Sequence, residues 1–186
     1  WQTCTSIAKN SWGYTENNKF KSAYHVICDL IDIVSKNGVM LLNVGPKPDG
    51  TITDEETAVL NEIGDWLKTN GEGIYDTVPW KTFGEGKVNT KDGSFKDNKT
   101  KKYTEKDFRF TYKDGAVYVF QMKPTHDGVI RIKNFKKIAQ DAIVYSVKLL
   151  GNHSPIIISR TKKYMELKLM EIPQTTLPLC FKIVLE

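Results

Sequence analysis

The side chains that could carry acid–base chemistry gather between residues 49 and 56 of the sequence. Asp49, Glu55 and Glu56 fall there, and a carboxylate can act as a nucleophile, a general acid or a general base. Asp49 precedes Gly50 in a turn pattern, in which its side chain accepts hydrogen bonds from nearby backbone N–H groups. Glu55 and Glu56 fall in the first turn of a predicted helix, where negative charge suits the helix dipole. These structural roles account for all three side chains, so none of them is assigned a catalytic role.

Histidine and cysteine residues give no sign of a metal or thiol site. The three histidines lie far apart and fit no zinc-ligand spacing. The three cysteines are also widely spaced, and their odd number gives no disulfide framework. Each cysteine is therefore expected to be a small buried apolar residue, and no metal or other cofactor is predicted. These six residues are His25, His126, His153, Cys4, Cys28 and Cys180.

The sequence has a net charge of +5, which raises the question of a nucleic-acid partner. Its densest basic run, residues 96–106, alternates with acidic and neutral polar residues. No Arg-rich helix and no aromatic-basic signature of an RNA-binding sheet accompanies it, so a solvated basic surface is favoured over polyanion contact. No apolar run of the sequence approaches the roughly 20 residues that cross a bilayer. Neither a nucleic-acid nor a membrane partner is predicted.

The first 80 residues read as alternating strands and helices. Residues 1–7 form a short strand candidate. A helix is predicted after the N-cap candidate Ser22, because apolar residues follow at helical spacing. Gly38 would end this helix in the left-handed conformation. Residues 39–44 form a continuous apolar run, typical of a parallel strand that is buried on both faces. A capping box from Thr53 then begins a helix over residues 54–69.

The pattern changes after residue 80. Residues 84–102 are rich in Gly, Lys, Asp and Thr and indicate loops or a linker. Short alternating strands follow, and two of them flank a hairpin turn at residues 113–115. In the second of these strands, Val117 and Val119 should face one way and Ala116, Tyr118 and Phe120 the other. The expected strands are 108–112, 116–120, 129–132, 143–150, 155–159, 165–169 and 181–185, which together predict an antiparallel sandwich.

Three segments of the first half resemble glycoside hydrolase family 29 α-L-fucosidases. The order and spacing of these motifs together are highly specific, and a looser resemblance continues through residues 107–111 and 147–151, so that it covers nearly the whole chain. The motifs are Trp1-Gln-Thr-Cys4 with Ser11-Trp-Gly-Tyr14, Asp32 to Gly38 with Leu41-Leu-Asn-Val-Gly-Pro46, and Ile63-Gly-Asp-Trp-Leu67 with Asn70-Gly-Glu72 and Pro79-Trp80.

This resemblance implies an α/β plus all-β architecture. Residues 1–80 would be the C-terminal part of a catalytic (β/α)8 barrel, residues 81–107 a linker and loops, and residues 108–186 a C-terminal β-sandwich. Two βα units cannot close an eight-stranded barrel, so the missing N-terminal barrel part is an expected partner. The chain opens at Trp1, inside a motif, which is the pattern of a fragment. Without that part, the first half is expected to be the less stable one, and proteolysis to begin within residues 84–102.

The resemblance also implies a function. Members of the family are retaining glycosidases, in which one carboxylate is the nucleophile and a second is the general acid/base. Both would lie before Trp1, so this chain by itself is expected to lack them and to be inactive. The implied substrate is a glycan with a terminal α-L-fucose, and the family leans towards secreted, periplasmic or lysosomal enzymes. The sequence leaves open whether the protein forms a homo-oligomer.

Three residues are candidates for the site. Trp12 follows the seventh barrel strand, where the resemblance implies an aromatic side chain against the apolar side of the sugar; packing of its loop onto the barrel is the alternative. Gln2 is an amide where many relatives have Glu, and an amide cannot transfer a proton, so its role would be a supporting hydrogen bond. Asn43, inside an apolar strand, must find hydrogen-bond partners, and structural support is favoured over ligand contact.

A second class of function is also compatible with the sequence. The chain could be a non-enzymatic carbohydrate-binding or structural module built on the predicted sandwich. The barrel-like motifs of the first half favour the enzyme, because a free-standing lectin has no need of barrel strands.

Overall fold

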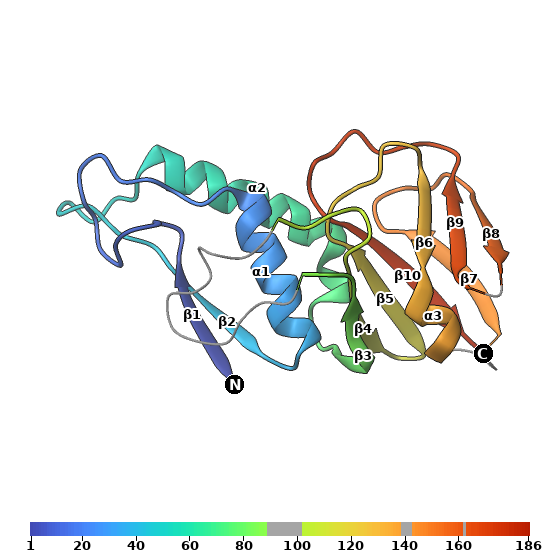
Figure 1. Cartoon of the computed structure of the whole chain (residues 1–186). Helices are drawn as coiled ribbons and strands as arrows, with labels where there is room; N and C mark the ends of the chain where they lie inside the picture. Colours follow the sequence, from blue (N-terminus) through green and yellow to red (C-terminus); the bar gives the residue numbers. More distant parts are fainter. Residues whose placement is uncertain (89–101, 139–142, 162) are drawn as a thin grey trace.

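The computed structural model describes residues 1–88, 102–138, 143–161 and 163–186. It is elongated, with a pair of strands at one end, two long helices in the middle and a group of antiparallel strands at the other end (Figure 1). The N-terminal elements are β1 (Gln2–Ser6), α1 (Ala23–Ser35), β2 (Val39–Asn43), α2 (Asp54–Asn70) and the short 3-10 helix η1 (Gly71–Gly73).

The strand–helix–strand–helix order that the sequence predicts for the first half is confirmed. Strands β1 and β2 run parallel, in a register from Gln2↔Val39 to Ser6↔Asn43. The side chain of Ser22 caps α1 by accepting a hydrogen bond from the N–H of His25 at 3.3 Å. Short polar side chains at these positions satisfy N–H groups that have no partner within the helix.

The end of α1 differs from the prediction. Asn37, rather than Gly38, takes the left-handed conformation, with φ 65°. Glycine is required at position 38 for a different reason, because a Cβ there would lie 2.6 Å from the indole ring of Trp1. The indole N–H of Trp1 also donates to the carbonyl of Lys36 at 3.1 Å, so the first residue is fastened to the end of α1.

The second half is an antiparallel sandwich, as the sequence predicts. One sheet has five strands in the order β3-β4-β5-β10-β7, and the other has three in the order β6-β9-β8. The short helix α3 (Lys133–Ile138) follows β6. The strands are β3 (Val78–Glu85), β4 (Phe108–Lys113), β5 (Ala116–Gln121), β6 (Val129–Ile132), β7 (Val144–Leu149), β8 (Ile156–Arg160), β9 (Met165–Leu169) and β10 (Leu179–Leu185).

The predicted alternation along β5 is confirmed. Val117 and Val119 belong to the core between the two sheets. Ala116, Tyr118 and Phe120 belong to a second core on the opposite face of the five-stranded sheet, together with residues of α1 and α2. Every residue of β5 is therefore buried, because the sheet is covered on both faces.

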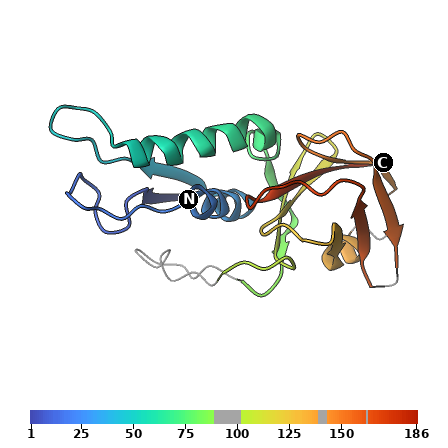
Figure 2. The ribbon, with the colours of Figure 1, turned by 90° about the horizontal axis from the view of Figure 1, so that it is seen from above.

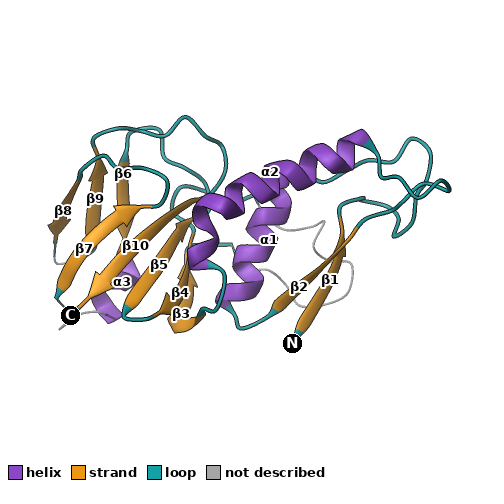
Figure 3. Ribbon diagram, turned by 180° about the vertical axis from the view of Figure 1, so that it is seen from behind, coloured by secondary structure: helices purple, strands orange, loops and turns teal. Residues whose placement is uncertain are grey.

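Helices α1 and α2 cover the outer face of the five-stranded sheet, between it and the β1–β2 pair (Figure 3). Ile27 and Ile31 of α1 and Trp66 of α2 share the second core with Phe120 of β5. Trp66 also donates its indole N–H to the carbonyl of Pro178 at 2.8 Å. The sandwich therefore supplies apolar partners to both helices in this chain. That the first half is the less stable one stays a prediction.

The expected linker also begins later than residue 81. Strand β3 spans residues 78–85 and pairs with β4 at the edge of the five-stranded sheet. Trp80 anchors it, because its ring stacks on Phe135 of α3 at 5.4 Å and meets Phe110 edge-on at 5.5 Å. The division of the chain into a barrel part up to residue 80, a linker up to residue 107 and a sandwich from residue 108 otherwise stays a prediction. Most of the segment where proteolysis is expected to begin, residues 89–101, lies outside the described residues.

Among the strands that the structure describes, β1 and β2 should be the least protected against hydrogen exchange. In the described part of the chain, the two strands pair with each other and with no further strand, and an isolated two-stranded sheet is marginally stable. We expect the amides of β1 and β2 to exchange about 100-fold faster than those of β5. Exchange measured by mass spectrometry tests this, and equal protection of the three strands would contradict it.

Candidate functional site

The candidate site lies where β1 and β2 end. Ser6 and Asn43 are paired at the carboxyl ends of these two parallel strands. The loops that follow, residues 7–22 and 44–53, therefore begin at the same edge. In barrels of parallel strands this edge carries the substrate-binding and catalytic groups.

The loop after β1, residues 9–19, is closed at its base and is called the Trp12 loop below. Lys9 donates its N–H to the carbonyl of Lys19 at 2.8 Å, and Lys21 donates to the carbonyl of Ile7 at the same distance. The ammonium group of Lys21, which is buried, also donates to the hydroxyl of Thr5 at 2.6 Å. These contacts hold both ends of the loop on β1.

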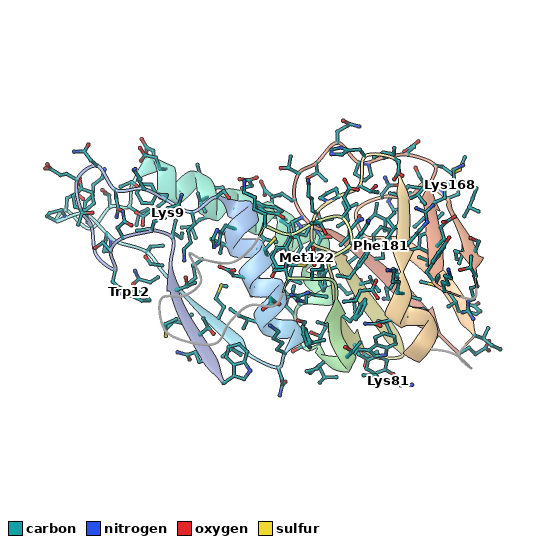
Figure 4. All side chains as sticks on the ribbon, viewed as in Figure 1. Lys9, Trp12, Lys81, Met122, Lys168 and Phe181 are labelled. Carbon is teal, nitrogen blue, oxygen red and sulfur yellow. The ribbon has the colours of Figure 1, made fainter. Side chains whose placement is uncertain are left out.

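The structure brings Trp12 and Asn43 together. The side-chain amide of Asn43 donates to the backbone carbonyl of Trp12 at 2.7 Å and to the hydroxyl of Ser6 at 3.3 Å. Asn43 thus has partners that satisfy it inside an otherwise apolar strand. The indole of Trp12 remains 46% exposed, at the end of the molecule away from the sandwich residues Lys168 and Phe181 (Figure 4).

Gln2 is not brought to this place. It is paired with Val39 at the start of β1, four residues before Ser6, which is about 13 Å along a strand. Its side-chain amide contacts the sulfur of Cys4 at 3.4 Å. The structure therefore separates Gln2 from Trp12 and Asn43, and a role for Gln2 in the site stays a prediction.

The turn role predicted for Asp49 is confirmed. Its carboxylate accepts the N–H of Thr51 at 2.9 Å and the hydroxyl of Thr51 at 2.7 Å. The first of these bonds, followed by the second, lowers the pKa of Asp49 from its ordinary value. The carboxyl group is therefore ionised at neutral pH, which does not suit a general acid.

Glu56 is a member of the site that sequence patterns did not reveal. Its buried carboxylate accepts the backbone N–H of Gly45, in the loop after β2, at 3.0 Å. The capping box predicted that the Glu56 side chain would turn back to the start of its own helix. The structure confirms that it does: the Thr53 hydroxyl oxygen accepts the N–H of Glu56 at 3.2 Å, and the Thr53 hydroxyl donates to the Glu56 carboxylate at 3.2 Å. The bond to Gly45 is the additional contact that the capping box does not predict.

The cysteines divide into two kinds. Cys28 and Cys180 are buried, as expected, and burial raises the pKa of both thiols. The same expectation is wrong for Cys4, which is exposed because it points to the open face of the β1–β2 pair.

Among the residues that the structure describes, no three His, Cys, Asp or Glu side chains gather closely enough to hold a metal ion. In that same part of the chain, no helix is both long enough and apolar enough to span a bilayer.

The fold therefore joins two strand–helix units, whose strands β1 and β2 are parallel, to a C-terminal antiparallel β-sandwich. Residues 1–72 match the family model described as alpha-L-fucosidase. The chain is 33% identical to the tissue alpha-L-fucosidase of Rattus norvegicus over 139 residues, which is 73% of this chain and 26% of the rat protein. It is 29% identical to the Mus musculus protein of the same name over 97% of this chain and 36% of the mouse protein.

Solved structures agree with this assignment. The alpha-fucosidase of Thermotoga maritima superposes with a TM-score of 0.73 at 26% identity, over 99% of this chain and 39% of that protein. This chain therefore belongs to the α-L-fucosidase family and corresponds to the C-terminal portion of its members. It spans between a quarter and two fifths of the length of these relatives.

Proposed function

We propose that the whole protein, meaning this chain together with the rest of its barrel, is a retaining α-L-fucosidase that releases terminal α-L-fucose from glycans. The observation that carries the proposal is the half-exposed residue Trp12 at the carboxyl edge of the strands, whose backbone carbonyl is bound by Asn43. The relatives named above, all described as fucosidases, support it. Release of nitrophenol from an aryl α-L-fucoside by the whole protein tests it, and hydrolysis of other aryl glycosides in its place would contradict it.

The chemistry of fucose suits an indole at this place. Fucose is a 6-deoxy sugar, so the substituent at C5 is a methyl group rather than a hydroxymethyl group. A methyl group presents a small apolar patch, and covering it with an aromatic ring removes apolar surface from water. In this proposal Trp12 binds and orients the sugar, while the nucleophile and the general acid/base come from the other barrel strands.

We also propose a division of labour within the chain. Residues 1–80 supply two strands of the barrel and the Trp12 loop, and residues 108–186 form the sandwich, to which β3 is added. The shared core of α1, α2 and β5 supports this proposal. Figure 2 shows that α2 runs along the molecule from the loops beside the site to the sandwich. In this arrangement the sandwich acts as a rigid base for the last helices of the barrel.

The Trp12→Ala variant of the whole protein should lose activity on fucosides. We expect kcat/KM to fall about 10- to 100-fold, from about 1.5–3 kcal/mol of lost apolar contact with the sugar. The matched control is Tyr145→Ala, which removes an exposed aromatic ring from β7 of the sandwich and should leave the kinetics unchanged. Unchanged kinetics of a normally folded Trp12→Ala variant would instead assign Trp12 to packing of its loop.

A further inference from the structure

We propose that the carboxylate of Glu56 positions the Trp12 loop and thereby sets the preference of the enzyme for a sugar with a C5 methyl group. This inference rests on the proposed function, because it assigns the indole of Trp12 to that methyl group. Glu56 lies in the first turn of α2 and its carboxylate is engaged by protein groups, so it is a positioning residue and not a catalytic one.

The carboxylate of Glu56 is a buried anchor for the loop after β2. The residue is 1% exposed. One carboxylate oxygen accepts the N–H of Gly45 at 3.0 Å, and the other accepts the hydroxyl of Thr53 at 3.2 Å. Burying a carboxylate is costly unless hydrogen bonds satisfy it. The bond to Gly45 is therefore part of what keeps this side chain inside, and it fixes the loop to the start of α2.

Gly45 passes this constraint to the Trp12 loop. The residue is buried, and a Cβ added to it would lie 2.9 Å from the carbonyl carbon of Gly13 and 2.9 Å from the nitrogen of Tyr14. The backbone of the second loop therefore lies close against the peptide between Gly13 and Tyr14, one residue after Trp12. Because Asn43 binds the carbonyl of Trp12 itself, the segment around the indole is held at two successive positions.

A helix-capping role explains the contact of Glu56 with Thr53 but not its contact with Gly45. Negative charge in the first turn of α2 is also supplied by Asp54 and Glu55, which are exposed. Glu56 differs from both because it is buried and because it binds a residue eleven positions earlier in the chain. One of its two contacts is with the N-cap residue Thr53, and the other leads away from the helix to Gly45, which lies against the Trp12 loop.

The test compares two substrates of the whole protein. One is an aryl α-L-fucoside, and the other is the matched aryl pentoside that lacks the C5 methyl group. A methyl group in an apolar pocket is worth about 10- to 200-fold in kcat/KM. We expect Glu56→Ala to reduce the ratio of the two kcat/KM values about five- to tenfold. The control Glu55→Ala should leave this ratio unchanged, and Glu56→Gln should keep most of it, because an amide oxygen still accepts the N–H of Gly45.

A second variant keeps the test decisive if Glu56→Ala fails to fold. Gly45→Ala retains the carboxylate but forces the peptide between Gly13 and Tyr14 to move, so the same fall in the ratio is expected. Suppose that the wild-type enzyme hydrolyses the fucoside and that the folded variants keep its ratio of the two kcat/KM values, even if both values fall equally. That result would overturn this inference but not the proposed function. A wild-type enzyme that does not hydrolyse the fucoside would overturn the proposed function, and the inference with it.

Discussion

The 186-residue chain on its own should release nitrophenol from an aryl α-L-fucoside at least about 10⁴-fold more slowly than the whole protein. A retaining mechanism needs two carboxylates about 5 Å apart across the glycosidic bond. At the carboxyl edge of β1 and β2, the carboxylate of Asp49 is engaged by Thr51 and that of Glu56 by Gly45. The lowered pKa of Asp49 does not suit a proton donor, and the carboxylate of Glu56 is buried with both oxygens bound by protein groups.

The assay requires rigorous purification, because a trace of a host fucosidase would imitate a weak activity. The whole protein, prepared in the same way, is the positive control. The purified chain could still show steady turnover that follows the protein through purification and is lost in a Trp12→Ala variant. That result would contradict the placement of both catalytic carboxylates in the rest of the barrel.

The Asp32→Ala variant should be strongly destabilised. Arg109 of β4 is 1% exposed, and its guanidinium pairs with the carboxylate of Asp32 on α1. The same guanidinium donates to the carbonyls of Phe108 at 2.9 Å and Val88 at 2.8 Å. Removing one partner of a buried pair leaves the other charge uncompensated, and we expect the unfolding free energy to fall by about 3–5 kcal/mol.

Urea denaturation of the purified chain measures this effect. The matched control is Asp65→Ala, which removes an exposed carboxylate from α2 and its pair with Lys68. Exposed pairs contribute about 0–1 kcal/mol, so the control should shift the midpoint little. The double variant Asp32→Leu with Arg109→Met should be more stable than Asp32→Ala, since the guanidinium is then no longer left buried without its carboxylate. Equal midpoints for Asp32→Ala and the control would show that this pair does not hold α1 to the sheet.

Much of the fold can be predicted from patterns of neighbouring residues in the sequence. The N-caps Ser22 and Thr53, and the alternation of Val117 and Val119 with Tyr118, are properties of neighbouring residues, and all of them are confirmed. Helical spacing and a hairpin turn depend on stretches of a few residues, so a sequence without any relatives still reveals them.

The remaining features depend on contacts between distant residues. The alternating pattern of its strand would place Arg109 on a face exposed to solvent. In the structure helices cover that face, and Arg109 pairs with Asp32, which lies 77 residues earlier in the chain. Strand β3 escapes prediction because Pro79 and Gly84 interrupt its pattern, while its stability comes from Trp80 packing on Phe135. The link from Glu56 through Gly45 to the Trp12 loop likewise follows from the way two loops meet.

The burial of Trp66 against the sandwich has a consequence for the order of events during synthesis. Its indole binds the carbonyl of Pro178, which the ribosome adds 112 residues later. Domains usually fold in turn as they emerge, the N-terminal one first. Here the last helix of the barrel cannot complete its packing until β10, the strand between β5 and β7, has been made. A premature stop before Leu179 would therefore leave α2 without the part of its core that Cys180 of β10 supplies.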